Sequence, residues 1–462
     1  MIPISIIQLT NITNGILYES NKKTEKDLFI ENISIDSRKK QKNSLFIALK
    51  GNKYDSHFFV KDAIKSGAII LLLNQKINVK FPQIIVKDTR LAMGKIANWI
   101  RKKCNAKIIG ITGSAGKTSV KEITASILSQ SNSTLYTYKN NNNNIGVALT
   151  LFQLSTKNKY VVIEVGSNTF GEIEYISKII NPDSILINNI FHAHLDKFKS
   201  IKGVSKEKGE ILSYLSKKGT GIFNLDSHDL KNWKSKFTDK QNIFYFSLFK
   251  KKNCHFYAKN IKTNINNVQF DMHTPIGILD KVLLNIPGIH NVSNVLAATA
   301  ISISVGANLN HIYNGILNSK PIKGRLYPII LKKNKFVFDD TYNSNIGSMI
   351  SAINFLSSQL NMYKVLVIGD TYELGKKSII FHKIIANYVI KSNLDEVFII
   401  GDKYKIVNNK IIFGKFFKSK NQIIKQLIQI INKKEKISIL IKGSRKMRME
   451  KIVKKIKEHF LC

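Results

Sequence analysis

A glycine-rich turn between a short apolar run and a helix-patterned segment constrains this chain more than any other feature. Residues 108–111 have the composition of a buried strand, and apolar residues recur at helical spacing over residues 119–128. The turn between them reads Thr-Gly-Ser-Ala-Gly-Lys-Thr. Glycines let the backbone approach an anion, and the free N–H groups at a helix start bind phosphate. We therefore expect nucleotide phosphates to contact Thr112, Gly113, Ser114, Ala115, Gly116, Lys117, Thr118 and Ser119.

The two polar residues that end this turn have distinct expected roles. Lys117 is placed to reach the β- and γ-phosphates, and the Thr118 hydroxyl is a suitable Mg²⁺ ligand. The spacing is shorter than in the common P-loop, since Ile111 stands where the first glycine would be. The alternative is a glycine-rich strand–helix turn that binds nothing.

Length and composition favour a soluble globular protein of several domains. A chain of 462 residues is too long for one core, and we expect three domains. No apolar run approaches the roughly 18 residues of a membrane span, and the amino terminus lacks signal-peptide features. The cysteines are few, far apart and without metal-binding spacing, namely Cys104, Cys254 and Cys462. They predict a reduced, cytoplasmic location without a zinc site or a membrane partner.

The net charge of +41 would ordinarily suggest a nucleic-acid partner. The basic residues are mostly lysines spread along the chain, and they accompany an excess of Ile and Asn with few Ala. AT-rich codons encode this set, so we attribute the charge to genome composition and expect no nucleic-acid partner. A polyanion partner remains the alternative.

Residues 1–88 alternate short apolar runs with turns and predict a small α/β domain. Ser37 and Arg38 follow one such run, within an Asp-Ser-Arg sequence. This position just past a strand leaves a functional role open, and the alternative is that Asp36 and Ser37 form a simple turn or helix cap.

Residues 89–318 predict a central nucleotide-binding domain with a mostly parallel sheet. Glu164 ends an apolar strand, where an unpaired carboxylate is costly unless it coordinates a cation such as Mg²⁺. His194 follows a further strand, in a position to join the same site or to be an ordinary loop residue. By their residue types alone, Lys206 and Lys208 are solvated helix charges.

A helix-patterned segment after residue 287 contains Asn291 and Asn294, which either cap the helix or hold a base. Before it, residues 224–284 are turn-rich and predict inserted hairpins without chemistry.

Residues 319–462 alternate strands and helices and predict a Rossmann-like, doubly wound domain. Polar residues cluster just past three of its strands, at residues 339–345, 369–375 and 442–445. Carboxyl ends of parallel strands share one sheet edge, so these clusters predict a site there.

Together these stretches resemble the Mur ligases, ATP-dependent amide-bond-forming enzymes of peptidoglycan synthesis. The likeness covers nearly the whole chain. It includes Asp36-Ser-Arg38, the glycine-rich turn, Glu164-Val-Gly-Ser-Asn168, His194-Leu-Asp196, Gly288-Ile-His-Asn-Val-Ser-Asn294, Gly324-Arg325, Asp339-Asp-Thr-Tyr-Asn-Ser-Asn345, Gly369-Asp-Thr-Tyr-Glu-Leu-Gly375 and Lys442-Gly-Ser-Arg445.

The resemblance implies a UDP-sugar domain, an ATPase domain and a mobile carboxyl-terminal domain that closes over ATP. It implies two Mg²⁺ ions held by Thr118, Glu164, His194 and a carbamylated Lys208, with Lys117, Glu164, His194 and Lys208 in catalysis. The remaining implied nucleotide contacts are Asn291, Asn294, Arg325 and Asp340. Substrate contacts are expected at Ser37, Arg38, Asn343, Asn345, Lys442, Ser444 and Arg445.

Within the family, the 339–345 sequence favours enzymes that add D-alanyl-D-alanine to a UDP-N-acetylmuramoyl-tripeptide through an acyl phosphate. A ligase that adds diaminopimelate should carry Asp-Asn-Pro-Arg, which this chain lacks. A ligase that adds the third residue, or a folylpolyglutamate synthetase, remains the alternative, and we expect a monomer. The chain departs from the family at Ser167 in place of Ala, at Lys197 and Lys199 in place of glycines, and at Ile346 in place of Pro.

Overall fold

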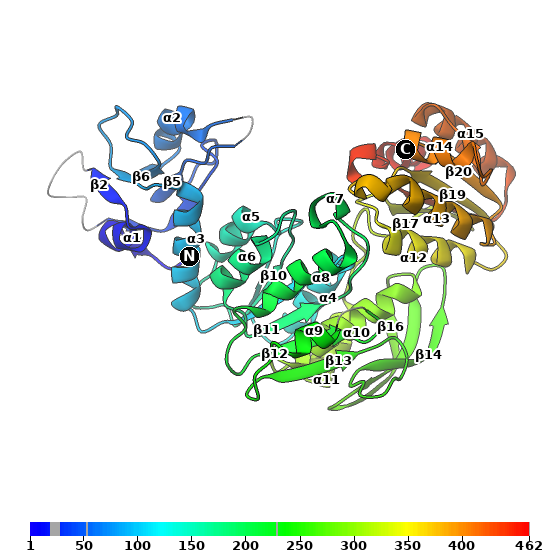
Figure 1. Ribbon diagram of the computed structural model, residues 1–462, viewed down its shortest axis with the longest axis horizontal. Coiled ribbons are helices and arrows are strands. Elements are labelled where there is room, and N and C mark those ends of the chain that lie inside the picture. The colour runs from blue at the N-terminus through cyan, green and yellow to red at the C-terminus, as the bar shows by residue number, and fades with distance from the viewer. Residues whose placement is uncertain (19–27, 52–53, 228–229, 462) are drawn as a thin grey trace.

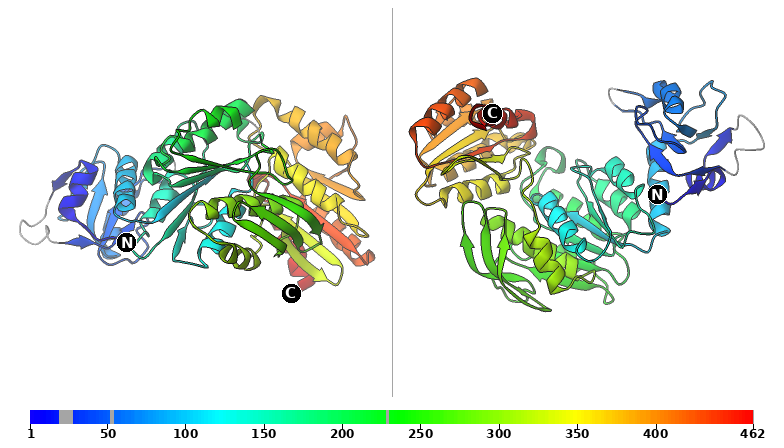
Figure 2. Two further views of the ribbon diagram at one scale, coloured as in Figure 1. Left: turned by 90° about the horizontal axis from the view of Figure 1, so that it is seen from below. Right: turned by 180° about the vertical axis from the view of Figure 1, so that it is seen from behind.

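The computed structural model describes residues 1–18, 28–51, 54–227 and 230–461. Three α/β bodies follow one another along the molecule, with the amino-terminal body at one end and the carboxyl-terminal body at the other (Figures 1 and 2). Each body contains its own main sheet. The expected three-domain α/β class is therefore confirmed, and the boundaries at residues 88 and 318 stay predictions. In the described part of the chain, no helix is long and apolar enough to cross a membrane.

The amino-terminal domain is built on a five-stranded sheet. Its strands lie in the order β2 (Ile16–Tyr18), β7 (Gln83–Ile85), β6 (Ala68–Leu73), β5 (Ser44–Ile47) and β4 (Asn32–Ser34). All neighbours are parallel except β2 and β7. A short antiparallel pair joins β1 (Ile4–Ser5) to β3 (Phe29–Ile30). The helices are α1 (Ile6–Thr13), α2 (Val60–Lys65) and α3 (Thr89–Lys102), the last of which leads into the central domain.

The central domain contains a six-stranded, fully parallel sheet. The strand order is β13 (Asn242–Phe246), β12 (Thr220–Asn224), β11 (Ser184–Ile187), β8 (Lys107–Thr112), β10 (Tyr160–Glu164) and β9 (Thr134–Tyr136). The connecting helices are α4 (Lys117–Leu128), α5 (Asn144–Leu151), α6 (Glu172–Ile180), α7 (Leu195–Phe198), α8 (Ile201–Gly209) and α9 (Leu230–Lys234).

Alternation along the strands gives this sheet two buried faces. In β8, Ile108 packs with α5 and α6, whereas Ile109 and Ile111 pack with α4 and α10 (Ile289–Ile303) on the opposite face. Both faces are covered, which is why the strands read as continuous apolar runs in the sequence. Beyond β13, a three-stranded antiparallel sheet adds to the hydrophobic core on the α4 and α10 face of the parallel sheet. It contains the hairpins expected there. It comprises β14 (Tyr257–Thr263), β15 (Val268–Thr274) and β16 (Gly277–Leu284), against which α11 (Leu309–Leu317) packs.

The carboxyl-terminal domain has a six-stranded sheet that is parallel except for its first pair. The order is β17 (Tyr327–Lys332), β18 (Lys335–Asp340), β22 (Ile437–Lys442), β19 (Tyr363–Gly369), β20 (Glu396–Ile400) and β21 (Lys415–Phe416). The helices are α12 (Ile346–Ser357), α13 (Ser378–Ile390), α14 (Asp402–Asn408), α15 (Lys420–Lys433) and α16 (Glu450–Leu461). The predicted doubly wound alternation is present.

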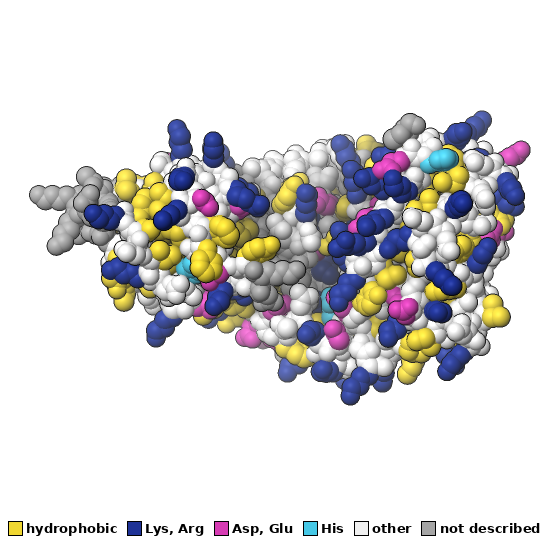
Figure 3. Space-filling model, turned by 90° about the horizontal axis from the view of Figure 1, so that it is seen from above, with side chains coloured by type: hydrophobic (Ala, Val, Ile, Leu, Met, Phe, Trp, Pro, Cys, Tyr) yellow, Lys and Arg dark blue, Asp and Glu magenta, His cyan; other side chains and the backbone are white. Residues whose placement is uncertain are grey.

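Basic side chains are spread over the face of the molecule shown in Figure 3, at both of its ends and among acidic and apolar side chains. On this face the basic side chains are therefore not confined to one end of the molecule.

Candidate active site

The predicted phosphate-binding turn lies between β8 and α4. Its two glycines adopt positive φ angles, +146° at Gly113 and +77° at Gly116. A Cβ atom on Gly116 would lie 2.4 Å from Asn294 Oδ1, so a side chain at this position would meet both backbone strain and a clash. The turn therefore requires glycine, as the sequence predicted, and it leaves the amino terminus of α4 open to an anion.

Lys117 folds its side chain back over this turn. Its Nζ donates a hydrogen bond to the Gly113 carbonyl oxygen at 2.8 Å. Burial lowers the pKa of the Lys117 ammonium, and the negative charge of Glu164 partly opposes that effect. The lysine is thus positioned at the turn that would hold the phosphates.

Glu164 lies beside the turn, because β10 pairs with β8 and aligns Glu164 with Ile111. The side chain is 1% exposed. Its Oε1 accepts a hydrogen bond from Asn142 Nδ2 at 2.8 Å, whereas its Oε2 is buried without a hydrogen-bond partner among the described residues. A buried, unpartnered carboxylate oxygen is costly, and a coordinated cation would relieve that cost.

The Thr118 hydroxyl is contacted from the linker to the carboxyl-terminal domain. Arg325 Nη2 donates to Thr118 Oγ1 at 2.7 Å, and the guanidinium group lies over the Tyr342 ring, 4.2 Å from its centroid. The structure therefore brings Arg325 to the phosphate turn, as the resemblance implied.

Lys208 is buried and Lys206 is exposed, although the residues stand two positions apart on α8. The Lys208 side chain donates to Ser167 Oγ at 3.2 Å. Burial, with the nearby charge of Lys117, lowers the pKa of Lys208 to about 7. The interpretation of both lysines as solvated helix charges is wrong for Lys208 and correct for Lys206. The carboxylate of the neighbouring Glu207 accepts hydrogen bonds from the N–H groups of Gly171 and Ile173, at the start of α6.

His194 precedes α7 and contacts the carboxyl-terminal domain. Its Nδ1 lies 2.7 Å from Glu373 Oε2. The hydrogen bond from His194 lowers the pKa of the Glu373 carboxyl group.

Asn291 and Asn294 lie inside α10, where both are buried. The helix is capped by Gly288, so the capping alternative is wrong. Asn294 Nδ2 donates to Asn291 Oδ1 at 2.9 Å, and Asn291 Nδ2 donates to the Pro287 carbonyl at 2.7 Å. Both asparagines line the cavity described below.

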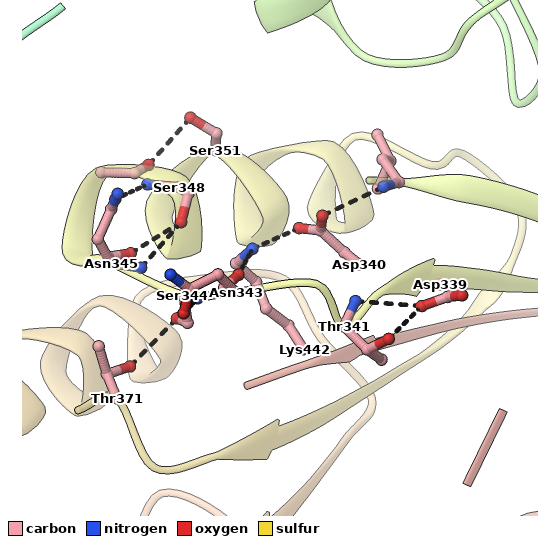
Figure 4. Close-up of polar contacts among 12 residues, drawn as sticks. Asp339, Asp340, Thr341, Asn343, Ser344, Asn345, Ser348, Ser351, Thr371 and Lys442 are labelled. Atoms are coloured by element: carbon pink, nitrogen blue, oxygen red, sulfur yellow. Dashed lines mark hydrogen bonds and ion pairs between the residues drawn. The ribbon is translucent and has the colours of Figure 1, made fainter. Parts of the chain in front are cut away.

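The carboxyl-terminal domain presents polar groups from the ends of β18 and β22 (Figure 4). Lys442 Nζ lies 2.7 Å from Asp340 Oδ2 and donates to the Asn343 carbonyl oxygen at 3.1 Å. The other Asp340 oxygen accepts from the Leu326 N–H at 3.1 Å. Asn345 caps α12 and also donates from Nδ2 to the Ser114 carbonyl at 3.2 Å, so the rim of this domain touches the phosphate turn.

A cavity of about 390 Å³ lies between the central and carboxyl-terminal domains, beside these contacts. Residues from both domains line it, and the set brings together most of the expected nucleotide contacts. Its predicted members are Ser114, Ala115, Gly116, Lys117, Ser119, His194, Asn291, Asn294, Arg325, Asp340, Asn343, Asn345 and Lys442.

Four expected substrate contacts lie elsewhere. Ser444 is buried and accepts from the Tyr372 N–H, and Arg445 is largely exposed and paired with Glu450 at 3.2 Å. Ser37 and Arg38 belong to the amino-terminal domain, which lies at the opposite end of the molecule from the carboxyl-terminal domain in Figure 1 and contributes no residue to the lining of this cavity. There Arg38 makes two 2.8 Å hydrogen bonds to Asp36, which lower the pKa of that carboxyl group to about 2.

Three residues at the site were not predicted individually. Asn142 lies in an asparagine-rich run, Glu373 lies in the 369–375 cluster, and Asn189 follows the strand end of β11. Asn189 Oδ1 accepts from the Ala115 N–H at 2.8 Å and so supports the turn. Their position past strand ends was the available signal.

Comparison with known proteins assigns the chain to a family. Residues 29–125 match the model of the Mur ligase family catalytic domain, residues 111–302 the Mur ligase middle domain, and residues 324–445 the Mur ligase glutamate ligase domain. The chain is 46% identical to the UDP-N-acetylmuramoyl-tripeptide–D-alanyl-D-alanine ligase of Buchnera aphidicola subsp. Acyrthosiphon pisum, over 98% of each chain. It is 41% identical to the protein of the same name from Escherichia coli, over 100% of both. The chain belongs to the Mur ligase family.

A solved structure supports the same assignment. MurF from Acinetobacter baumannii superposes on this Mur ligase with a TM-score of 0.91, at 33% sequence identity and 99% coverage of each chain. Two of the departures from the family pattern have visible consequences here. Ser167 supplies the hydroxyl that contacts Lys208, and Lys199, expected from the resemblance to replace a glycine, takes a positive φ of 65°.

Proposed function

We propose that this Mur ligase joins D-alanyl-D-alanine to a UDP-N-acetylmuramoyl-tripeptide, with ATP converted to ADP and phosphate. The observation that carries the proposal is the cavity into which the phosphate turn and the rim of the carboxyl-terminal domain both project. Full-length relatives that bear this activity in their names support the choice of substrates.

We place ATP in this cavity by the chemistry of the residues that line it. The phosphates belong at the turn, where Lys117 and the start of α4 favour negative charge. Asn291 and Asn294 line the same cavity, and we assign them to the adenine on the family resemblance. Arg325 is within reach of the phosphates through its contact with Thr118.

The residues present fit Mg²⁺. Glu164 offers the buried, unpartnered Oε2, and Thr118 offers a hydroxyl oxygen, and both are hard ligands. Among the described residues, no group of three or more His, Cys, Asp and Glu side chains is placed to hold a metal without help. Mg²⁺ commonly takes few protein ligands, and phosphate oxygens and water complete its coordination. When bound, Mg²⁺ would neutralise phosphate charge during transfer.

Lys208 enters this proposal as a carbamate. An ammonium group cannot ligate a cation, whereas CO₂ bound to a neutral amine gives an anion with two oxygens. Lys208 is buried next to the Ser167 hydroxyl and within electrostatic reach of Glu164 and Lys117, where a carbamate would be held. With Glu164, Thr118 and His194, it would complete the ligands for two ions.

The chemistry then proceeds in two steps. The terminal carboxylate of the tripeptide attacks the γ-phosphorus and ADP leaves, which gives an acyl phosphate. The D-alanyl-D-alanine amine attacks the acyl carbon, loses a proton and expels phosphate. Lys117 stabilises negative charge on the transferring phosphoryl group.

The proposal also assigns a role to each of the three domains. Residues 1–88 bind the UDP-sugar, through Ser37 and Arg38. Residues 89–318 bind ATP. Residues 319–462 hold the dipeptide. We assign that role to residues at or just past the ends of β18 and β22, namely Asn343, Asn345, Lys442, Ser444 and Arg445. The enzyme acts as a monomer in the cytoplasm.

A substrate-dependence assay tests the function. Phosphate release from ATP should require the UDP-tripeptide and D-alanyl-D-alanine together, and mass spectrometry should detect the UDP-pentapeptide. Diaminopimelate with the UDP-dipeptide should not replace them, and nor should DNA or RNA. Phosphate release that depends on nucleic acid, or on diaminopimelate, would refute the proposal.

A further inference from the structure

The loop between β11 and α8 contacts the carboxyl-terminal domain at several points. A Cβ atom on Gly347 of α12 would lie 2.5 Å from the Phe191 ring. The rings of His192 and Phe381 are 5.0 Å apart. The Asp196 N–H donates to the Glu373 carbonyl at 3.4 Å. These contacts place the loop directly against the carboxyl-terminal domain.

At the centre of this contact, Glu373 Oε2 lies 2.7 Å from His194 Nδ1. A carboxylate can only accept a hydrogen bond, so the proton of the neutral imidazole resides on Nδ1. The lone pair of the ring is then on Nε2, the nitrogen that remains available to a cation or a phosphate. A carboxylate on the far nitrogen is a common way to orient a metal-binding histidine.

The backbone around Glu373 also indicates a dedicated position. Glu373 has φ +64°, in the left-handed region that costs a residue other than glycine about 1 kcal/mol. Gly375 follows with φ +64°, and a Cβ atom there would lie 3.4 Å from the Asp196 backbone. The segment approaches the His194 loop closely at a conformational cost, which an incidental surface ion pair would not offset.

We propose that Glu373 is a positioning residue that orients His194, so that the metal site is completed by docking of the carboxyl-terminal domain. The inference rests on the proposed function, in which His194 faces the metal. It couples the domain assigned to the second substrate with the chemistry at the phosphate turn.

The test uses the full-length enzyme and three variants. Glu373→Ala should raise the Mg²⁺ concentration needed for half-maximal rate by about 10- to 100-fold, the usual effect of losing such a partner. Glu373→Gln, which retains an acceptor oxygen, should recover part of that loss. Glu396→Ala is the matched control, because Glu396 is a carboxylate of the same domain whose partner is the Tyr363 hydroxyl, at 2.7 Å.

Two further measurements separate positioning from simple docking. Electron paramagnetic resonance of Mn²⁺ with a non-hydrolysable ATP analogue should show weaker Mn²⁺ binding in Glu373→Ala, without any turnover. In a His194→Ala background, Glu373→Ala should have no further effect on Mn²⁺ binding. Unchanged Mg²⁺ and Mn²⁺ dependence, or an equal effect without His194, would overturn the inference. If wild-type protein instead makes no UDP-pentapeptide, the proposed function itself fails.

Discussion

The side-chain amide of Asn142 donates to one oxygen of Glu164, and the other oxygen is buried without a hydrogen-bond partner among the described residues. The donor–acceptor distance is 2.8 Å, and the backbone of Asn142 is itself held, since its carbonyl accepts from the Gly166 N–H at 2.8 Å. The loop that follows β9 therefore sets the direction of the carboxylate proposed to bind Mg²⁺.

Asn142→Ala should weaken Mg²⁺ binding without unfolding the protein. Loss of a partner that orients a metal ligand typically costs about 10- to 100-fold in metal affinity. We expect the Mg²⁺ half-saturation of ADP release to rise by that factor. Asn158→Ala is the control, because the Asn158 side chain accepts from Ser155 and donates to Ser133 and, among the described residues, makes no hydrogen bond to Glu164. Equal Mg²⁺ dependence in the two variants would contradict the role of Asn142.

Lys117→Ala should leave a folded protein with kcat lowered by about 10²- to 10³-fold, because one preorganised charge at a developing anion is worth that much. Steady-state kinetics at saturating substrates measures the effect, and circular dichroism checks the fold. A folded variant with a tenth of the wild-type rate would show that Lys117 does not serve the transferred phosphate.

Most of the fold was predictable because buried parallel strands are short apolar runs bounded by turn residues. Residues 108–111 and 160–164 gave β8 and β10 in this way. Such runs do not reveal which residues far apart in the sequence contact one another in the folded protein. The contact of Arg325 with Thr118 joins residues 207 positions apart, and only the packed domains bring them together.

The site was predictable where its residues form a short sequence motif. It was less predictable where the role of a residue depends on whether its side chain is buried. The glycines of the phosphate turn could be recognised from spacing. Lys206 and Lys208 could not be told apart by charge, since only the packing of α8 against α6 makes one exposed and the other 2% exposed. Glu373 was hidden for the same reason, because its partner lies on another domain.

Lys199 and Lys197 stand where the family resemblance implies glycines. Changing each of them to glycine should alter the stability of the protein in opposite directions. Lys199 is the centre of a tight turn closed by the Ser200 N–H on the Phe198 carbonyl at 2.7 Å, with φ 65° and ψ −38°. Glycine adopts this strained conformation at lower cost. Lys199→Gly should therefore stabilise the protein by about 1 kcal/mol, a rise of about 2–4 °C in Tm.

Lys197 lies within α7, where its backbone is helical. Lys197→Gly should lower stability by about 1 kcal/mol, because glycine is a poor helix former. Differential scanning calorimetry of the two variants gives the comparison. The same sign of change in Tm for both would contradict the strain assigned to Lys199.

The three domains should close when substrates bind. The amino-terminal domain lies at the opposite end of the molecule from the carboxyl-terminal domain in Figures 1 and 2, while its Ser37 and Arg38 are assigned to the UDP-sugar. Domain closure around ligands is the usual way to assemble a site from separate bodies. Small-angle scattering with a non-hydrolysable ATP analogue and the UDP-tripeptide should give a smaller radius of gyration than either ligand alone. An unchanged radius at saturation would argue against closure.

The carbamate on Lys208 makes the most specific prediction. Lys208→Ala should abolish ligation, since it removes two anionic oxygens beside Glu164, and acetate should restore part of the rate by occupying the space. Lys206→Ala should retain full activity, because that side chain is exposed on the same helix. Lys208→Arg keeps a cation but cannot be carbamylated, so it should be inactive as well. In wild-type protein, ¹³C-bicarbonate should give a carbamate signal by NMR that is lost in Lys208→Ala. A fully active Lys208→Arg enzyme would mean that the side chain acts as a cation and that no carbamate is needed.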